Sequence, residues 1–508
     1  MKLKQSTVCH TCRAHKIGCD GKLPTCSQCF LTGRRCGGYK LDPVFIPYTA
    51  TRVPRASRKN RATNSSAAVP SNVGLIALNV GCAIPGSSAR EPPTWQIPRP
   101  IDIASSEEYA AVVLSCFVPK YQQNPPSFDI STSQVCGAWV GILPSLVARA
   151  SSGELITSAT KAFATSILDR SAQAKSKSFQ SLEAYNTTVQ RLNKELLSAK
   201  GFFSVQTAAS IVCLAMVELM LPISDNGHLA HCGGLGALIN SFSPGLFACS
   251  ELHAIFVGCR PVLLFQALTT RKATFLGQNK WLTSPFKHHP PSEIQALIGD
   301  AAILPSIMET IDILPTLPRT TAVAQAQEME TKLGETFGHL SKWSERFERD
   351  MNGSPGPPRQ IEVLECRKHS ITHFWFPSLV AANVHTHMWA FQIICLLERG
   401  KLVPYLPDGD AGRDESRIFD NLSSFASNIC QCMEYLLQDD LQLFGPASAV
   451  FPLNIAYEVL NKDKELHKQQ IERCCVVFDQ IRGRGISSKA LFPAAYRETR
   501  FSNDLHKH

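Results

Sequence analysis

The sequence predicts a small two-helix module at residues 5–40, a disordered linker at 41–103 and a large all-α body at 104–490, followed by a tail at 491–508. Three observations predict this division. Six of the 19 cysteines lie between Cys9 and Cys36, the next segment is rich in proline, and apolar residues then recur at helical spacing. With 508 residues, 44% of them hydrophobic, the chain can bury a sizeable core, which excludes wholesale disorder.

The N-terminal cysteines repeat one unit, C-x2-C-x6-C, twice. Thiolates suit tetrahedral zinc, and six of them can complete two four-coordinate Zn²⁺ ions only if two thiolates bridge. No ligand position then remains for water, and so short a segment cannot bury a core. We therefore expect a zinc-stapled module with two structural Zn²⁺ ions, held by Cys9, Cys12, Cys19, Cys26, Cys29 and Cys36.

The positive charge of the chain is concentrated in the same region. Residues 1–62 hold 13 Lys and Arg against only Asp20 and Asp42, whereas the whole chain carries a net charge of +9. The rest of the chain is therefore close to neutral. A basic module on a neutral body indicates a polyanionic partner, either nucleic acid or an anionic membrane.

The segment CHTCRAHKIGCDGKLPTCSQCFLTGRRC closely resembles the fungal zinc binuclear cluster DNA-binding domain. The pattern of that family is C-x2-C-R-x2-K-x-[KR]-C-D, followed by a loop with proline and then C-x2-C and a last cysteine. Arg13, Lys16 and Asp20 match it, and Pro24 stands at the loop proline. Gly18 departs from the pattern, because the family usually has Lys or Arg there.

The resemblance implies that the first helix of the module enters the DNA major groove and reads a CGG-type triplet. It places Lys16 at the main base-reading position with His15 beside it, and lysine can donate to guanine O6 and N7. Arg13 is a candidate phosphate contact. Further phosphate contacts are expected from Lys22, Arg34, Arg35 and Lys40.

The resemblance further implies that Cys9 and Cys26 bridge the zinc ions, and that the protein is a nuclear, sequence-specific transcription factor for RNA polymerase II genes. Its partners would be double-stranded DNA and the transcription machinery or co-regulators, and secondary metabolism is a plausible target by association. The alternative is a zinc-stapled scaffold whose basic head docks on RNA or protein without reading sequence. The two differ in the ratio of specific to random DNA binding.

The proline-rich segment 41–103 contains no heptad pattern, so a coiled-coil dimer is not expected, and the chain binds as a monomer or dimerises through its body. Its basic run fits a nuclear import signal or further phosphate contacts, with a solvated charge run as the alternative. The run contains Arg52, Arg55, Arg58, Lys59 and Arg61.

In the body, helical periodicity predicts helices at 179–200, 204–221, 324–350, 371–398, 415–437 and 464–483, with loops at 354–359 and 407–414. No alternating strand or hairpin is expected. The longest apolar stretch, Ile211–Ile223, contains Glu218, so no membrane-spanning helix is expected either.

The body weakly resembles the helical regulatory region of fungal zinc-cluster regulators, which implies a small-molecule effector or a protein partner. The alternative is that the matching residues are packing positions, which we favour for His231. The matches are His231, Gly234, Leu238 and Ile239, then Arg260, Ala267, Arg271 and Trp281.

No catalytic motif is present, and we expect no enzyme. His373, His385 and His387 lie among aromatic residues and are interpreted as packed, hydrogen-bonded side chains rather than catalytic or metal-binding ones. Two cysteine pairs, Cys430/Cys432 and Cys474/Cys475, lack ligand spacing and are expected to have no partner cysteines nearby. They are interpreted as small buried hydrophobes rather than redox or metal pairs.

Overall fold

The chain divides into two units, Met1–Tyr48 and Thr49–His508. The computed structural model describes residues 10–15, 17, 19, 27–32 and 34 of the first unit, and 105–120, 137–151, 153–171, 179–198, 204–221, 223–224, 226–349, 359–365, 369–406 and 415–487 of the second. The predicted linker, its basic run Arg52–Arg61, the loop at 407–414 and the tail at 491–508 lie outside the described residues.

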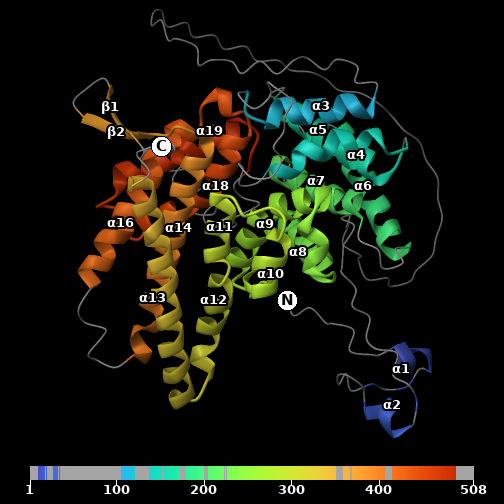
Figure 1. Ribbon diagram of the computed structural model, residues 1–508, viewed down its shortest axis with the longest axis horizontal. Coiled ribbons are helices and arrows are strands. Elements are labelled where there is room, and N and C mark those ends of the chain that lie inside the picture. The colour runs from blue at the N-terminus through green and yellow to red at the C-terminus, as the bar shows by residue number, and fades with distance from the viewer. Residues whose placement is uncertain are drawn as a thin grey trace, which may run out of the picture. The chain divides into compact units, whose positions relative to one another are not determined.

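The first unit contains α1 (His10–Ala14) and α2 (Ser27–Leu31). The described part of the second unit, which lies within the predicted body at 104–490, is mainly helical (Figure 1). Its elements are α3 (Ser106–Phe117), η2 (Ala138–Ile142), α4 (Leu143–Ala148), α5 (Leu155–Ser171), α6 (Phe179–Ser198), α7 (Val205–Met220), α8 (Gly227–Asn240), η3 (Pro244–Ala248), α9 (Ser250–Thr270), η4 (Phe275–Gly277), α10 (Asn279–Thr283), η5 (Ser284–Phe286), α11 (Glu293–Ala301), α12 (Leu304–Ile313), η6 (Leu314–Thr316), α13 (Arg319–Arg349), β1 (Arg359–Glu365), β2 (His369–Trp375), α14 (Leu379–Leu402), η7 (Val403–Tyr405), α16 (Glu415–Gln431), α17 (Met433–Leu436), η8 (Asp439–Leu441), α18 (Phe444–Leu460) and α19 (Lys468–Gly483).

Several body helices begin at a serine that caps them. Ser105 and Glu108 form a reciprocal capping box at α3, in which the Glu108 N–H donates to Ser105 Oγ. Ser204 and Ser378 accept from the third N–H of α7 and α14 at 3.2 Å. The predicted helices at 179–200 and 204–221 are confirmed as α6 and α7, and α7 begins directly after its predicted first residue, the cap Ser204.

The expectation of a body without strands is wrong for one segment. β1 and β2 form an antiparallel hairpin in which Ile361 lies opposite His373 and Val363 opposite Ile371. The helix predicted over 371–398 therefore begins only at Leu379. The physical reason is Pro377: inside a helix it would remove a hydrogen bond and clash with the carbonyl four residues earlier. The chain instead stays extended up to the cap at Ser378.

The hairpin is held by aromatic contacts with the helices around it. Trp375 and Phe376 both contact the Tyr435 ring of α17, with ring centroids 5.4 Å apart in each pair. Phe374 lies 5.9 Å from Trp389 of α14. These partners are distant in the chain, so a local sequence pattern does not predict them. Tertiary packing therefore stabilises these strands.

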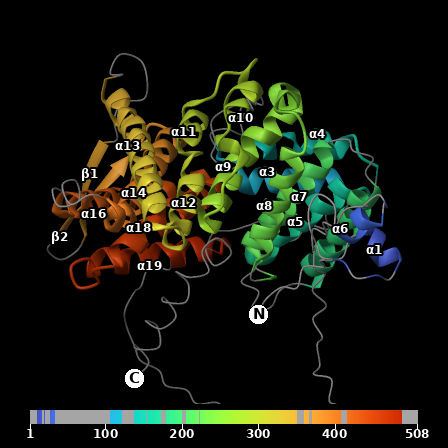
Figure 2. The same cartoon turned by 90° about the horizontal axis from the view of Figure 1, so that it is seen from below.

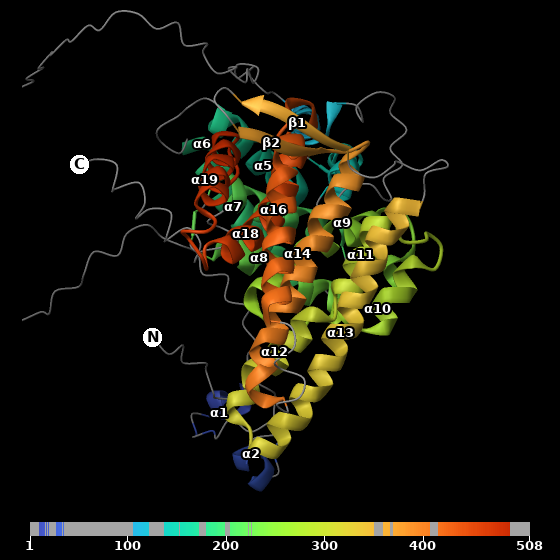
Figure 3. The same ribbon diagram turned by 90° about the vertical axis from the view of Figure 1, so that its left-hand side faces the viewer.

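The long helix α13 lies alongside α12 and α14 (Figure 3). It was predicted from 324 to 350 and begins five residues earlier, directly after Pro318. Leu333 and Leu340 are completely buried, and Trp343 is nearly so and donates to Asp300 Oδ2. The apolar stripe read from the sequence thus faces the core, as helical periodicity predicts.

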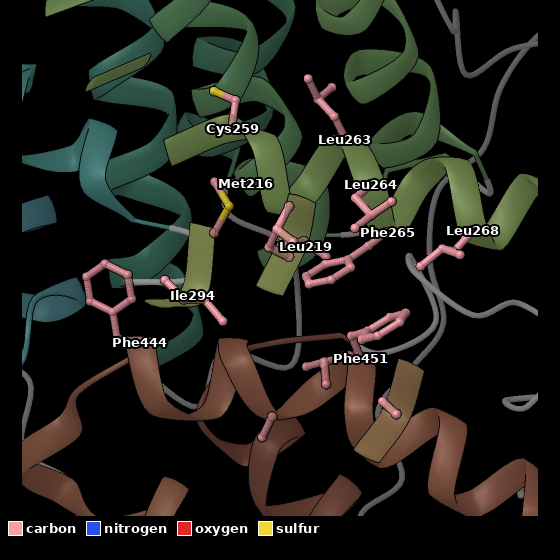
Figure 4. Close-up of a cluster of buried hydrophobic side chains, with 14 of the residues drawn as sticks. Met216, Leu219, Cys259, Leu263, Leu264, Phe265, Leu268, Ile294, Phe444 and Phe451 are labelled. Atoms are coloured by element: carbon pink, nitrogen blue, oxygen red, sulfur yellow. The ribbon is translucent and has the colours of Figure 1, made fainter. Parts of the chain in front are cut away.

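Helix α9 connects the two halves of the body, since it contacts α7 and α8 on one side and α11 and α12 on the other (Figure 2). In the core, Phe265 of α9 stacks on Phe451 of α18 with ring centroids 4.2 Å apart (Figure 4). Leu263 and Leu264 lie in the same cluster and are almost completely buried. This apolar contact joins segments nearly two hundred residues apart in the chain.

Pro261 interrupts α9 in this buried setting. Proline has no N–H, so the carbonyl of Val257, four residues earlier, loses its helical donor. Gln295 of α11 replaces that donor: its Nε2 lies 3.0 Å from Val257 O. The carbonyl of Gln295 in turn accepts from the guanidinium of Arg260, which is 1% exposed. A buried polar network therefore compensates the break in α9 and ties it to α11.

Two helical segments, Glu251–Thr270 and Leu379–Tyr405, are long and apolar enough to cross a bilayer by composition alone. The apolar pattern of the sequence predicts no such segment, so that expectation is wrong by composition. Most of each one is buried against the rest of the body, as is typical of core helices in a folded domain.

His385 and His387 are packed residues, as the sequence analysis expected. Their Nδ1 atoms lie 2.8 Å from the carbonyls of Ala381 and Asn383, one turn earlier in α14. The His387 ring also packs against Phe265 and Phe451, and its Nε2 has no hydrogen-bond partner among the described residues. Burial lowers the pKa of His387 to about 4.

Gln295→Leu is expected to destabilise the body by about 2–3 kcal/mol, because it leaves the Val257 carbonyl buried without a donor. In a Pro261→Ala background the helix regains its own N–H donor, so the same substitution should cost clearly less. Urea unfolding of the four proteins of this double-mutant cycle measures the difference. Equal costs in both backgrounds would contradict the role given to Gln295.

The body is expected to lose stability as the pH falls from about 6.5 to about 4. The folded-state pKa of His387 lies below its unfolded value, so the unfolded chain binds more protons in this window and acid favours unfolding. In His387→Leu, the decrease in the free energy of unfolding between about pH 6.5 and pH 4 should be smaller than in the wild type by up to about 3 kcal/mol. Urea unfolding at several pH values tests this, with His339→Leu, an exposed position of α13, as the control. An unchanged slope in His387→Leu would refute it.

Candidate metal cluster and nucleic-acid interface

The two short helices of the first unit repeat the same backbone hydrogen bonds, seventeen residues apart. The His15 N–H donates to Thr11 O at 3.1 Å, as the Thr32 N–H donates to Gln28 O at 3.2 Å. Each helix is then closed by a bond spanning five residues, from Ile17 to Cys12 O (3.0 Å) and from Arg34 to Cys29 O (2.9 Å). The doubled sequence unit is therefore also a doubled structural unit.

The second cysteines of the two halves meet. The Sγ atoms of Cys12 and Cys29 lie 3.9 Å apart, and both residues are buried although the unit is small. A disulfide would bring the sulfurs to about 2.05 Å. The spacing therefore excludes a formed disulfide, and it is compatible with thiolates gathered around metal ions.

Of the other predicted ligands, Cys19 is described and is half-buried, whereas Cys9, Cys26 and Cys36 lie outside the described residues. Among the described residues, no three metal-ligating side chains form a group. The donor set read from the sequence, six thiolates in two equal halves, is chemically suited to zinc. The repeated helices and the Cys12–Cys29 approach support this fit.

The predicted DNA-contacting residues are described only in part. His15 at the end of α1 and Arg34 after α2 are both exposed. Arg13 lies within α1, but its side chain is not described. The remaining predicted contacts lie outside the described residues; they are Lys16, Lys22, Arg35 and Lys40.

In the body, His231 belongs to a buried polar network that the sequence did not reveal. Its Nε2 lies 3.0 Å from the hydroxyl of Tyr185, which donates to Glu218 Oε1 at 2.8 Å. Glu218 also accepts from the N–H of Ile223 at 2.9 Å. Burial, followed by the proximity of His228, lowers the pKa of His231 to about 4. The network joins α6, α7 and α8, which supports the packing interpretation of His231.

The other body residues singled out in the sequence also lie in packed positions. Trp281 is completely buried against Phe256. Arg271 ends α9 in the left-handed conformation and pairs with Asp312 and Glu398, which joins α9 to α12 and α14. The pKa of Arg271 is raised, first by its hydrogen bond to Glu398. These residues hold the helices together.

One expectation about the cysteines is wrong. Cys430/Cys432 and Cys474/Cys475 were taken to lack partner cysteines, yet Cys430 of α16 and Cys474 of α19 approach to 3.3 Å between sulfurs. The two residues are 44 positions apart, so only the packing of α16 against α19 brings them together.

Removing zinc with a strong chelator is expected to unfold the first unit and leave the body folded, because only the body has an apolar core of its own. Hydrogen exchange of the full chain should show lost protection in residues 10–34 and unchanged protection in 205–220. Cys12→Ala should lose zinc, whereas Cys249→Ala, at an exposed body cysteine, should retain it. Full zinc content in Cys12→Ala would contradict the ligand assignment.

Comparison with known proteins followed from these features. No curated protein and no solved structure matched the chain, and no family model supports the resemblance of the body to the fungal regulatory region. Residues 7–43 match the family model of the fungal Zn(2)-Cys(6) binuclear cluster domain. That family is typical of fungal DNA-binding transcription factors, not of enzymes. The chain thus carries, at its N-terminus, a zinc-binding and DNA-binding domain of the Zn(2)-Cys(6) binuclear cluster family.

Proposed function

We propose that this protein is a nuclear, sequence-specific transcription factor for RNA polymerase II genes, which reads CGG-like triplets through α1. The observation that carries the proposal is the cluster domain at residues 7–43, set in the strongly basic segment 1–62. A short module with helices and cationic side chains that can contact phosphates is suited to binding the surface of duplex DNA. Two structural Zn²⁺ ions would supply the rigidity.

The two helices are equivalent in backbone structure but differ in their side chains, and this difference supports α1 as the helix that reads DNA bases. At equivalent positions the first half has Arg13, His15 and Lys16, whereas the second half has Phe30, Thr32 and Gly33. At these three positions only the first half offers cationic donors, whereas the cations of the second half, Arg34 and Arg35, follow α2 and are proposed as phosphate contacts. Leu31 of α2 is 78% exposed, but an aliphatic side chain cannot donate to a guanine.

In this proposal Lys16 donates to guanine, and Arg13 with the other module cations contacts phosphates. Gly18 and His15 replace cations that the family commonly carries, so the electrostatic part of the affinity is reduced at these two positions. The basic run Arg52–Arg61 serves nuclear import or adds phosphate contacts.

The body would control the output of the DNA-binding module through a co-regulator, a small-molecule effector or a homodimer contact. For an effector, one described surface feature is an open cleft of about 400 Å³ where α5, α6 and α7 meet. Arg191 and Lys194 line it together with Glu154 and Glu195. Charges of both signs would favour a polar or zwitterionic molecule over a lipid.

The alternative function is a zinc-stapled scaffold whose basic head docks on RNA or protein. The same charge supports it, because counterion release from a polyanion does not depend on sequence. The alternative requires no difference between specific and random duplexes, whereas the transcription-factor proposal requires a preference of at least about 10³-fold.

Selection of bound sites from a random DNA pool, with the zinc-loaded full chain at near-physiological salt, is the experiment that separates the two. Enrichment of a CGG-like triplet is expected, singly for a monomer or as two triplets at fixed spacing for a dimer. Binding that only fades with salt, without enrichment, would favour the scaffold.

Substitutions test the roles of individual side chains on the selected site. Lys16→Ala should weaken the free energy of binding to the selected site by about 1–3 kcal/mol, because a base contact is lost, and should change binding to random duplex little. Arg35→Ala should weaken binding to both alike, because a phosphate contact carries no sequence information. Equal losses on both duplexes for Lys16→Ala would exclude base reading by this residue.

A further inference from the structure

Two thiols of the body face each other across the interface between α16 and α19. The sulfurs of Cys430 and Cys474 lie 3.3 Å apart, close enough for a thiol–thiol hydrogen bond but not bonded. A disulfide needs about 2.05 Å between sulfurs, so a shift of little over about 1 Å would connect them. Ser423 Oγ of α16 also contacts Nε2 of His467, the residue directly before α19, at 3.3 Å.

The two thiols differ in access. Cys474 is 1% exposed, whereas Cys430 is only partly buried. The hydrogen bond with Cys430, followed by burial, raises the pKa of Cys474 well above its usual value. An oxidant from solvent therefore reaches Cys430 first, and Cys474 stands behind it.

The neighbouring cysteines do not compete for this contact. The Cys432 thiol is completely buried and donates to Asn428 O at 3.1 Å. Cys475 follows Cys474 on α19, and successive residues of a helix point about 100° apart. Other body thiols, such as Cys213 and Cys395, are completely buried in the core.

We propose that Cys430 and Cys474 form a peroxide-oxidisable dithiol site whose disulfide ties α19 to α16. The Cys430 sulfur attacks the O–O bond of hydrogen peroxide, forms a sulfenic acid and releases one water. The Cys474 sulfur then attacks the Cys430 sulfur: the S–S bond forms, the S–O bond breaks, and the leaving hydroxide takes the Cys474 proton as a second water. Two thiols lose two electrons in total, and one peroxide is reduced to two waters.

The disulfide would restrict the movement of α19, the last helix of the described body. It closes a loop between residues 44 positions apart, which restricts the unfolded chain and stabilises the folded one. α19 leads directly to Ser487, whose N–H donates to Leu219 O of α7. Oxidation would therefore hold α19 and this contact in place, and a thiol reductant would release them by exchange.

Peptide mapping of the full-length, zinc-loaded chain tests the proposal. After brief exposure to hydrogen peroxide, free thiols are blocked with N-ethylmaleimide and the protein is cut with trypsin. The peptides Ile418–Lys462 and Cys474–Arg482 should be joined and should separate on reduction. In Cys432→Ser/Cys475→Ser, Cys430 and Cys474 are the only thiols of these peptides, and the link should persist. The predicted zinc-binding cysteines lie in other tryptic peptides and do not interfere with the identification of this disulfide-linked pair.

Thermal unfolding supplies the second readout. Oxidation should raise the melting temperature of the body by several degrees in the wild type and in Cys475→Ser, and should have no such effect in Cys430→Ser or Cys474→Ser. Both Cys430→Ser and Cys474→Ser are measured, because a substitution at the partly exposed Cys430 is less prone to a folding defect than one at the buried Cys474. A Cys430 that proceeds to sulfinic acid without the link, or a link that disappears in Cys432→Ser/Cys475→Ser, would overturn the proposal.

Discussion

Metal–thiolate coordination is the constraint on which the N-terminal unit depends. α1 and α2 are each five residues long, far too short to be stable as isolated helices in water. The unit offers little apolar material, and its most buried described residues, Cys12 and Cys29, are themselves predicted ligands. Because the fold is held from inside by sulfur and metal, its surface can carry cations in place of apolar contacts. That freedom makes so small a unit suitable for binding a polyanion.

The body follows a different principle, in which buried apolar helices are connected by a few buried polar groups. α9 passes through the core with a proline in its interior, and Gln295 donates to the carbonyl that the break leaves free, while Arg260 donates to the Gln295 carbonyl. The stacking of Phe265 on Phe451 then fixes α9 against α18, a second buried helix with an internal proline. A break in a buried helix is tolerated where a neighbouring side chain supplies the missing donor.

Sulfur plays distinct parts in the two units, and the surroundings decide which. The Cys12–Cys29 contact belongs to a basic segment whose sequence holds six predicted thiolate ligands, where metal binding is favoured. The Cys430–Cys474 contact lies between α16 and α19, and the described residues around it supply no third ligand. Two thiols without further ligands are suited to a disulfide and poorly suited to zinc.

The sequence by itself determined the zinc-cluster domain, the excess of charge in the first unit and the long helices such as α6, α7 and α13. These features are local: ligand spacing, charge and helical period are all read within about thirty residues, and the cap at Ser204 confirms what the period predicts. Only the tertiary structure decided the hairpin at 359–375, the replacement of a helical donor by Gln295, and the meeting of Cys430 with Cys474. Each of these depends on a partner that the sequence order does not identify. The physical reason is that packing brings distant segments into contact, and the energy of that contact overrides local preference.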